Sequence, residues 1–206
     1  MKIKKNKAHI VIASLIYLIV TLAIVLINSF VLNFGFHTEY TISRYIGLST
    51  WSAVTFSFAS LFIFYHIFKY LSFIKSKHNM NKLWWIISLI TIIALVIVGL
   101  FPVGYFDQTF GNFGIVSKIH RTSAYIMFCS SILMVFLTVI KFYKERFFST
   151  VSILFIIYGL LFVFGYAFNI TFFQNIILFF EAIFLAFYLS VLYIIPKSLK
   201  SAKTPK

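Results

Sequence analysis

Three residues that can bind an anion or move a proton stand together after residue 114: Lys118, His120 and Arg121. Ser117 is a predicted N-cap, which places them in the first turn of a helix. Cations are unfavourable there, because the amino end of a helix carries partial positive charge. The cluster therefore needs an anion, either a neighbouring carboxylate or an external phosphate or carboxylate. The alternative explanation is that these side chains extend to the membrane surface and contact lipid phosphates.

Three further charged residues are candidates for the same site: Arg44, Asp107 and Glu181. Glu181 lies within the last apolar run, about 10 Å below Gln174 at a rise of about 1.5 Å per residue. An ionisable side chain at that depth is costly, so we expect it to face the bundle interior and to pair with Arg44 or Arg121. A protonated carboxyl group, or one bonded to a neighbouring helix for packing, is the alternative.

These six residues predict a polar pocket that recognises a lipid head group or a small anion. A second hypothesis is a membrane-embedded hydrolase or transferase in which His120 works with Glu181 or Asp107 as an acid/base pair. No clear nucleophile and no three-ligand metal set accompany them, so we assign no catalytic residue and predict no metal or other cofactor. A third hypothesis is a subunit or sensor that acts through protein partners, which the sequence does not identify.

The composition indicates the class of protein that carries these residues. Of 206 residues, 62% are hydrophobic and 11% are charged, whereas roughly a quarter are charged in soluble domains. The formal net charge of +14 is spread over short clusters between apolar runs of about 20 residues, the length that crosses a bilayer. This distribution argues against nucleic-acid binding and predicts an integral membrane protein in contact with membrane lipids. The single cysteine, Cys129, makes no intrachain disulfide.

The apolar runs predict the fold class. Each run should be a helix, because lipid offers no hydrogen-bond partner to the backbone, and the alternation typical of strands is absent. We therefore predict an all-α integral membrane protein, a bundle of six transmembrane helices in one domain of residues 1–206, with a basic cytoplasmic tail at 197–206. The predicted spans cover about 9–32, 51–73, 83–101, 122–140, 147–168 and 175–195.

The basic residues orient the predicted bundle. Arg44, Lys118 and Arg121 lie on one side. Fifteen lie on the other: Lys2, Lys4, Lys5, Lys7, Lys69, Lys75, Lys77, Lys82, Lys141, Lys144, Arg146, Lys197, Lys200, Lys203 and Lys206. The positive-inside rule then places both termini in the cytoplasm and predicts a multi-pass protein of the plasma membrane. Because the first apolar run is long and ends at no small-residue cleavage site, we expect a retained span rather than a signal peptide.

The two outer loops that follow from this topology, near 33–50 and 102–121, hold most of the candidate residues. In the first, Ile42, Tyr45 and Ile46 recur at i, i+3 and i+4 opposite Arg44. This spacing predicts a short amphipathic helix lying on the membrane surface. Trp51 follows as an aromatic anchor at the interface.

Four features, in chain order, resemble a known family. They are Tyr40-Thr-Ile-Ser-Arg44 ahead of Trp51, then Gly99-Leu-Phe-Pro102, then Ile119-His120, and Glu181 in the last span. The pattern covers nearly the whole chain and is similar to the prokaryotic membrane family catalogued as domain of unknown function 998, related in outline to the Frag1/DRAM/Sfk1 membrane proteins. In that family an aspartate often follows the proline closely and an arginine often follows the glutamate; here Asp107 is five residues on and Ala182 follows Glu181. The resemblance implies six helices and an outward polar cluster, and it implies no reaction.

Overall fold

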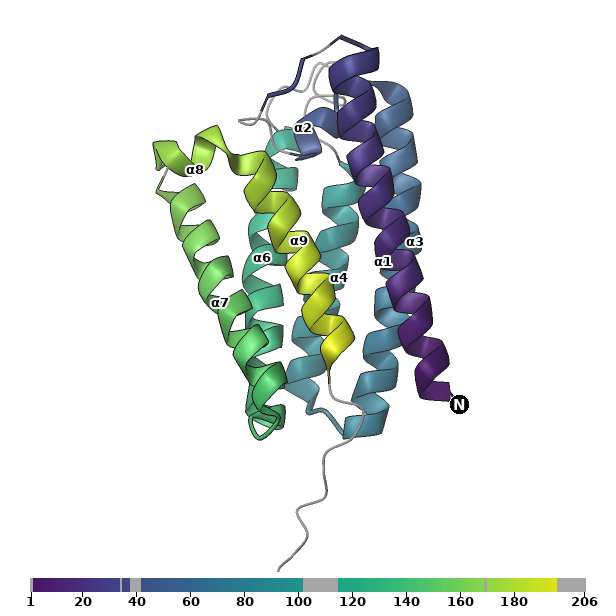
Figure 1. Cartoon of the computed structure of the whole chain (residues 1–206), viewed down its shortest axis with the longest axis vertical. Coiled ribbons are helices and arrows are strands. Elements are labelled where there is room, and N and C mark those ends of the chain that lie inside the picture. The colour runs from purple at the N-terminus through teal and green to yellow at the C-terminus, as the bar shows by residue number, and fades with distance from the viewer. Residues whose placement is uncertain (1, 34, 38–41, 102–114, 169, 196–206) are drawn as a thin grey trace, which may run out of the picture.

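The computed structural model describes residues 2–33, 35–37, 42–101, 115–168 and 170–195. Every regular element in these ranges is helical, and six helices are long and apolar enough to cross a membrane (Figure 1). The chain is therefore a multi-pass membrane protein, and the predicted all-α fold class is confirmed. The long helices are α1 (Lys2–Leu26), α3 (Thr50–His78), α4 (Lys82–Leu100), α6 (Ile115–Phe142), α7 (Arg146–Ala167) and α9 (Ile177–Ile194). The short ones are η1 (Ile27–Val31), α2 (Ile42–Ile46) and α8 (Thr171–Asn175).

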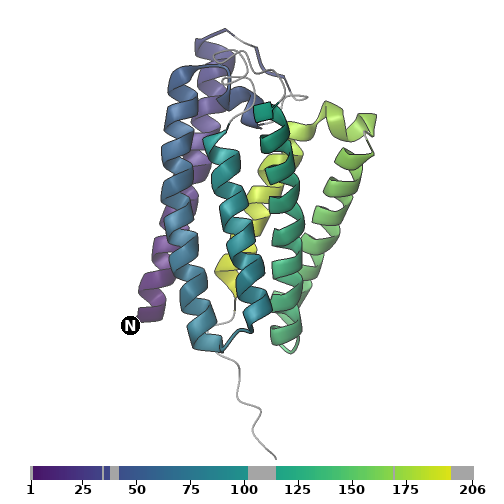
Figure 2. The same ribbon diagram turned by 180° about the vertical axis from the view of Figure 1, so that it is seen from behind.

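The helices form one antiparallel bundle (Figures 1 and 2). Neighbours pack in the order α1, α3, α4, α6, α7 and α9, and α9 returns to α1. Helix α1 begins and α9 ends at the same end of the bundle, which we call the terminal end. Helices α2 and α8 lie at the opposite end, which we call the α2 end. The described candidate residues lie on α2, near the start of α6 and near the start of α9, and therefore at the α2 end.

The link between α3 and α4 shows how the sequence fixes a tight reversal. Asn79 ends α3 in the left-handed conformation, with φ 48° and ψ 53°, which asparagine tolerates better than most residues. The side chain of Asn81 then accepts a hydrogen bond from the backbone N–H of Trp84 at 2.8 Å and caps the start of α4. Two asparagines therefore satisfy backbone groups that a short link would otherwise leave without partners.

Polar side chains join α4 to α6 inside the bundle. The Trp84 indole N–H donates to the Thr138 hydroxyl at 2.9 Å. The Thr91 hydroxyl donates to that of Ser130, also at 2.9 Å. Helices in lipid gain little from apolar burial against one another, so small side chains and such hydrogen bonds fix their relative positions. His120 belongs to α6, so these bonds also fix its position relative to α4.

The start of α6 differs from the sequence-based expectation. The helix already includes Ile115, so Ser117 lies within it, and the prediction of Ser117 as the N-cap is wrong. The predicted span began at residue 122 because hydropathy marks where apolar composition resumes. The polar segment Lys118–Arg121 continues the same helix towards the membrane surface, because a helix keeps its backbone hydrogen bonds in either medium. His120 and Arg121 consequently lie beyond the first turn of α6.

Helix α2 forms where the spacing of Ile42, Tyr45 and Ile46 predicts a helix. Its apolar face is not on the membrane surface, however. Ile42, Tyr45 and Ile46 are 5%, 0% and 1% exposed, because α2 packs against α1, α3 and α9. An amphipathic pattern gives the apolar face of a helix and leaves open whether lipid or protein covers it. Here protein covers it.

The orientation of the bundle stays a prediction, and single cysteines test it. In a Cys129→Ala background, we expect a membrane-impermeant thiol reagent added to intact cells to label Thr171→Cys, at the α2 end, and to spare Ser76→Cys, near the terminal end. Both positions are exposed, so a difference reports the side of the membrane rather than burial. Labelling of Ser76→Cys alone would reverse the predicted topology.

Candidate functional site

A cavity lies inside the bundle near the α2 end, and we call it the α2-end cavity. Three of its lining side chains are polar: Tyr17 from α1, His120 from α6 and Glu181 from α9. The rest of the lining is apolar and includes Ile42 and Ile46 of α2. The volume open to the centres of water-sized spheres is about 50 Å³, which is several times the 10–15 Å³ or so that one water needs by that measure.

His120 points into the bundle and is 5% exposed. Its Nδ1 lies 2.7 Å from the carbonyl oxygen of Phe101, the residue that ends α4. A carbonyl can only accept, so Nδ1 carries the proton, and in the neutral ring the lone pair is on Nε2. The bond also satisfies a carbonyl at the carboxyl end of α4, which helix geometry leaves without an intrahelical partner. The ring orientation and tautomer are thus fixed by the backbone of another helix.

Glu181 is half-buried one turn into α9. Its Oε2 accepts a hydrogen bond of 2.7 Å from the backbone N–H of Ile42, the first residue of α2. A carboxylate is favourable there, because the first N–H groups of a helix have no intrahelical acceptor and carry partial positive charge. The bond ties the last span to the first connecting segment.

Tyr17 is the member of this group that sequence reasoning missed. It is 4% exposed, and its ring centroid lies 5.4 Å from that of Phe56 on α3. Tyrosine is common in membrane helices, so its type alone carries little information. The feature of the sequence that could have identified Tyr17 is its position. It is the only tyrosine in the first predicted span, and it lies near the middle of that span rather than at a membrane interface.

Helix α2 is also held from its other side, by the short π-helix η1. Asn28 of η1 is fully buried. Its Nδ2 donates to the carbonyls of Ile24 and Tyr45 at 2.9 and 3.2 Å and to the Ser52 hydroxyl at 2.8 Å. The Tyr45 hydroxyl in turn accepts from the His37 N–H at 2.6 Å. A π-helical turn is uncommon and often marks a functional region; here it places Asn28 against α2 and α3.

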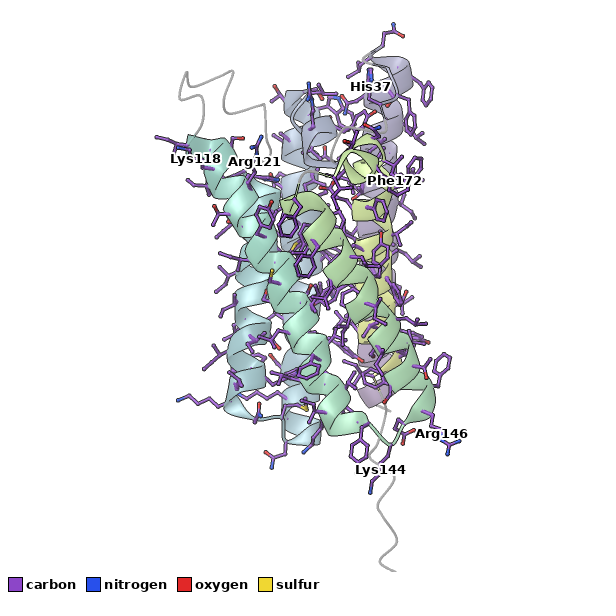
Figure 3. The ribbon with its side chains drawn as sticks, turned by 90° about the vertical axis from the view of Figure 1, so that its left-hand side faces the viewer. His37, Lys118, Arg121, Lys144, Arg146 and Phe172 are labelled. Carbon is purple, nitrogen blue, oxygen red and sulfur yellow. The ribbon has the colours of Figure 1, made fainter. Side chains whose placement is uncertain are left out.

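The structure separates the three basic residues of α6. Lys118 and Arg121 are exposed, whereas His120 is buried. The two cations lie about 60° apart around the helix, and His120 lies about 100° or more from either, at 3.6 residues per turn. Figure 3 shows Lys118 and Arg121 projecting from the α2 end of α6. The hypothesis that all three side chains face one ligand is therefore not supported by their burial.

The remaining predicted site residues lie elsewhere. Arg44 is exposed on α2, two residues from the N–H that Glu181 binds. Asp107 lies outside the described residues. The pairing of Glu181 with Arg44 or Arg121 stays a prediction, and the hydrogen bond that the structure gives this carboxylate comes from the Ile42 backbone. Of the six predicted residues, His120 and Glu181 are brought to one cavity.

The arrangement combines a hydrogen-bond acceptor and an imidazole in apolar surroundings. The Glu181 carboxylate accepts from N–H or O–H donors, and Nε2 of His120 accepts when the ring is neutral and donates when it is charged. Among the described residues, no group of three histidine, cysteine, aspartate or glutamate side chains could hold a metal ion. Compared with models of protein families, with curated proteins and with solved structures, the chain matches none.

Proposed function

We propose that this membrane protein binds the polar head of an amphiphile in the α2-end cavity, between His120 and Glu181. The observation that carries the proposal is that these two side chains, from α6 and α9, line one cavity that is otherwise apolar apart from Tyr17. A buried polar group needs a partner, and a cavity that holds two such groups and has room for more than one water suits a small polar ligand.

The ligand head carries an N–H or O–H donor. A head with a primary ammonium or a hydroxyl group can donate to Glu181 and meet Nε2 of His120. A free inorganic anion would face the carboxylate at close range, which is unfavourable. The exposed Lys118 and Arg121 suit the phosphate of a lipid instead, outside the cavity. The lipid-head-group reading is therefore favoured over the small-anion reading.

The same proposal includes the membrane in which the protein lies, the side of that membrane that the cavity faces, and the family to which the chain belongs. The excess of basic residues at the terminal end supports cytoplasmic termini in the plasma membrane and an α2-end cavity that faces outward. Membership in the family of domain of unknown function 998 agrees with a polar cluster on that side, and it stays a prediction.

Head-group binding is tested with purified protein in phosphatidylcholine nanodiscs, with and without phosphatidylethanolamine. Ethanolamine has three N–H donors and choline has none, so we expect phosphatidylethanolamine to raise the melting temperature of the wild type. Glu181→Gln should lose most of this shift, because an amide oxygen keeps the bond to Ile42 but lacks the charge that holds an ammonium group.

The matched control is Glu145→Gln, the same change between α6 and α7 at the terminal end. It should respond to phosphatidylethanolamine like the wild type. If Glu181→Gln is stabilised as much as Glu145→Gln, the α2-end cavity does not bind the head group. A melting temperature that rises with inorganic phosphate and not with phosphatidylethanolamine would favour the small-anion reading.

A second candidate function is hydrolysis or group transfer. It is favoured by the tautomer of His120, since donation from Nδ1 to the Phe101 carbonyl leaves Nε2 as a base, and Glu181 lines the same cavity. The test is release of a water-soluble head group or a fatty acid from radiolabelled lipid in the same nanodiscs. Release that disappears in His120→Gln would assign catalysis to the site.

A further inference from the structure

A second cavity lies deeper in the bundle, directly behind the first, and we call it the inner cavity. The two share four lining residues: Tyr17, Leu95, Met127 and Leu185. By the same measure the inner cavity has a volume of about 20 Å³, room for little more than one water-sized group, so a longer group enters only when lining side chains move. Because the same four side chains line both spaces, the two cavities are neighbours, and a ligand in the first contacts side chains that also line the second.

The inner cavity presents an almost wholly apolar surface even though four hydroxyl-bearing residues line it, Tyr17 at the boundary with the α2-end cavity and Thr91, Ser131 and Tyr188 beyond it. Thr91 donates to the Ile87 carbonyl and to Ser130, at 3.0 and 2.9 Å. Ser131 donates to the Phe128 carbonyl at 2.8 Å, and the Tyr188 hydroxyl points at the Met134 sulfur at 3.8 Å. A buried water needs two to four polar partners, roughly, and apolar cavities stay dry and accept apolar molecules. The inner cavity therefore suits hydrocarbon.

The two cavities follow one another along the bundle axis. On α4, Val98 lines the α2-end cavity and Thr91 the inner one; on α9, Glu181 lines the first and Tyr188 the second. Seven residues of helix correspond to about 10 Å along the axis. The polar cavity is nearer the membrane surface and the apolar cavity nearer its middle, which is the order of head and chain in a lipid.

We propose that a hydrocarbon chain of the bound amphiphile enters the bundle behind His120 and Glu181 and occupies the inner cavity. The inference rests on the proposed function and names the ligand class: a molecule with one chain free to leave the bilayer and a head that donates hydrogen bonds. Met127, at the boundary of the two cavities, is the flexible residue that can move aside for the chain.

The test uses ethylamine and octylamine, which share a head and differ in chain length. Binding is measured by thermal shift in phosphatidylcholine nanodiscs against the free aqueous concentration of ligand. In the wild type we expect octylamine to bind more than about tenfold more tightly than ethylamine. Each methylene withdrawn from water increases the affinity roughly fourfold. Ile92→Phe fills the inner cavity from α4 and should reduce this ratio at least about fivefold, with ethylamine binding unchanged.

The matched control is Ile93→Phe, because Ile93 is 56% exposed on the lipid-facing side of the same helix while Ile92 is 1% exposed. It should keep the wild-type ratio. If Ile92→Phe does not fold, Leu189→Phe fills the same cavity from α9. Octylamine with a diazirine at its chain end provides a second readout, and it should crosslink to Tyr188, Leu189 or Ile67, which line the inner cavity.

The outcomes separate the two proposals. An unchanged chain-length ratio in both filling variants, or crosslinks confined to lipid-facing residues, would overturn the chain inference and leave head binding intact. Loss of ethylamine binding in Glu181→Gln supports the proposed function, and unchanged binding of both amines in that variant would overturn it. Reduced octylamine preference in Ile92→Phe, together with crosslinking to the inner cavity, supports the chain inference.

Discussion

Asn28→Leu should lower the free energy of unfolding by about 3 kcal/mol, the cost of leaving buried polar groups without partners. The leucine is close in size to asparagine but cannot donate to the Tyr45 carbonyl or the Ser52 hydroxyl, which belong to other segments of the chain. Both groups are buried, so water cannot replace the amide. For a chain of this size the loss corresponds to a fall in melting temperature of roughly 10 °C, measured in detergent.

Thr21→Val is the matched control for Asn28→Leu. Thr21 is a buried polar residue of the same helical segment, 7% exposed, and its hydroxyl donates to the Tyr17 carbonyl within α1. Because that carbonyl also takes part in the helix, the change should cost under about 1 kcal/mol. Equal stability losses in the two variants would mean that Asn28 contributes no more than a local bond and does not hold α2 in place.

Gly99→Ala should destabilise the protein by about 1–3 kcal/mol, through overpacking between α3 and α4. A methyl group at Gly99 would meet both Oγ and Cβ of Ser60, which is 1% exposed. The serine hydroxyl could rotate away, but its Cβ is fixed to the backbone of α3, so the helices must separate. The Ser57 hydroxyl donates to the Gly99 carbonyl at 3.1 Å and would lose its bond in the process.

A double-variant cycle checks this cause. Ser60→Gly removes the atoms that the new methyl group meets, so Gly99→Ala with Ser60→Gly should be more stable than the sum of the two single effects predicts. Gly159→Ala serves as a comparison, because its methyl group would meet the flexible end of Ile132, 2.8 Å away. If the cycle is additive in thermal unfolding measurements, the close approach of α3 and α4 is not the source of the loss.

Asn28 and Gly99 matter to the candidate site because they fix the positions of helices that line the α2-end cavity. Asn28 holds the carboxyl end of α2, and Glu181 holds its amino end. Gly99 allows α3 to approach α4 beside Phe56 and Val98, which line the α2-end cavity. A variant at either position should therefore weaken ligand binding along with stability, whereas Glu181→Gln should weaken binding with little effect on folding.

The sequence by itself determined the class of protein and its helices. Six apolar runs can only be helices in lipid, because every backbone hydrogen bond must be made within the segment. Composition also predicted Glu181 as a candidate site residue, since a carboxyl group within an apolar run is costly wherever the helix packs. The amphipathic spacing of Ile42, Tyr45 and Ile46 was enough to predict α2. Each of these inferences depends on local composition, which the chain carries before it folds.

The tertiary structure alone decided which side chains meet. Lys118, His120 and Arg121 are adjacent in sequence, yet the packing of α6 buries His120 and exposes the other two. Tyr17 and Glu181 are far apart in sequence, yet they line one cavity. The partner of Glu181 is a backbone N–H, which has no signature in the sequence because every residue except proline carries one. Which helix faces which is set by small residues such as Gly99 and by interhelical bonds such as those of Asn28, and their geometry exists only in the packed bundle.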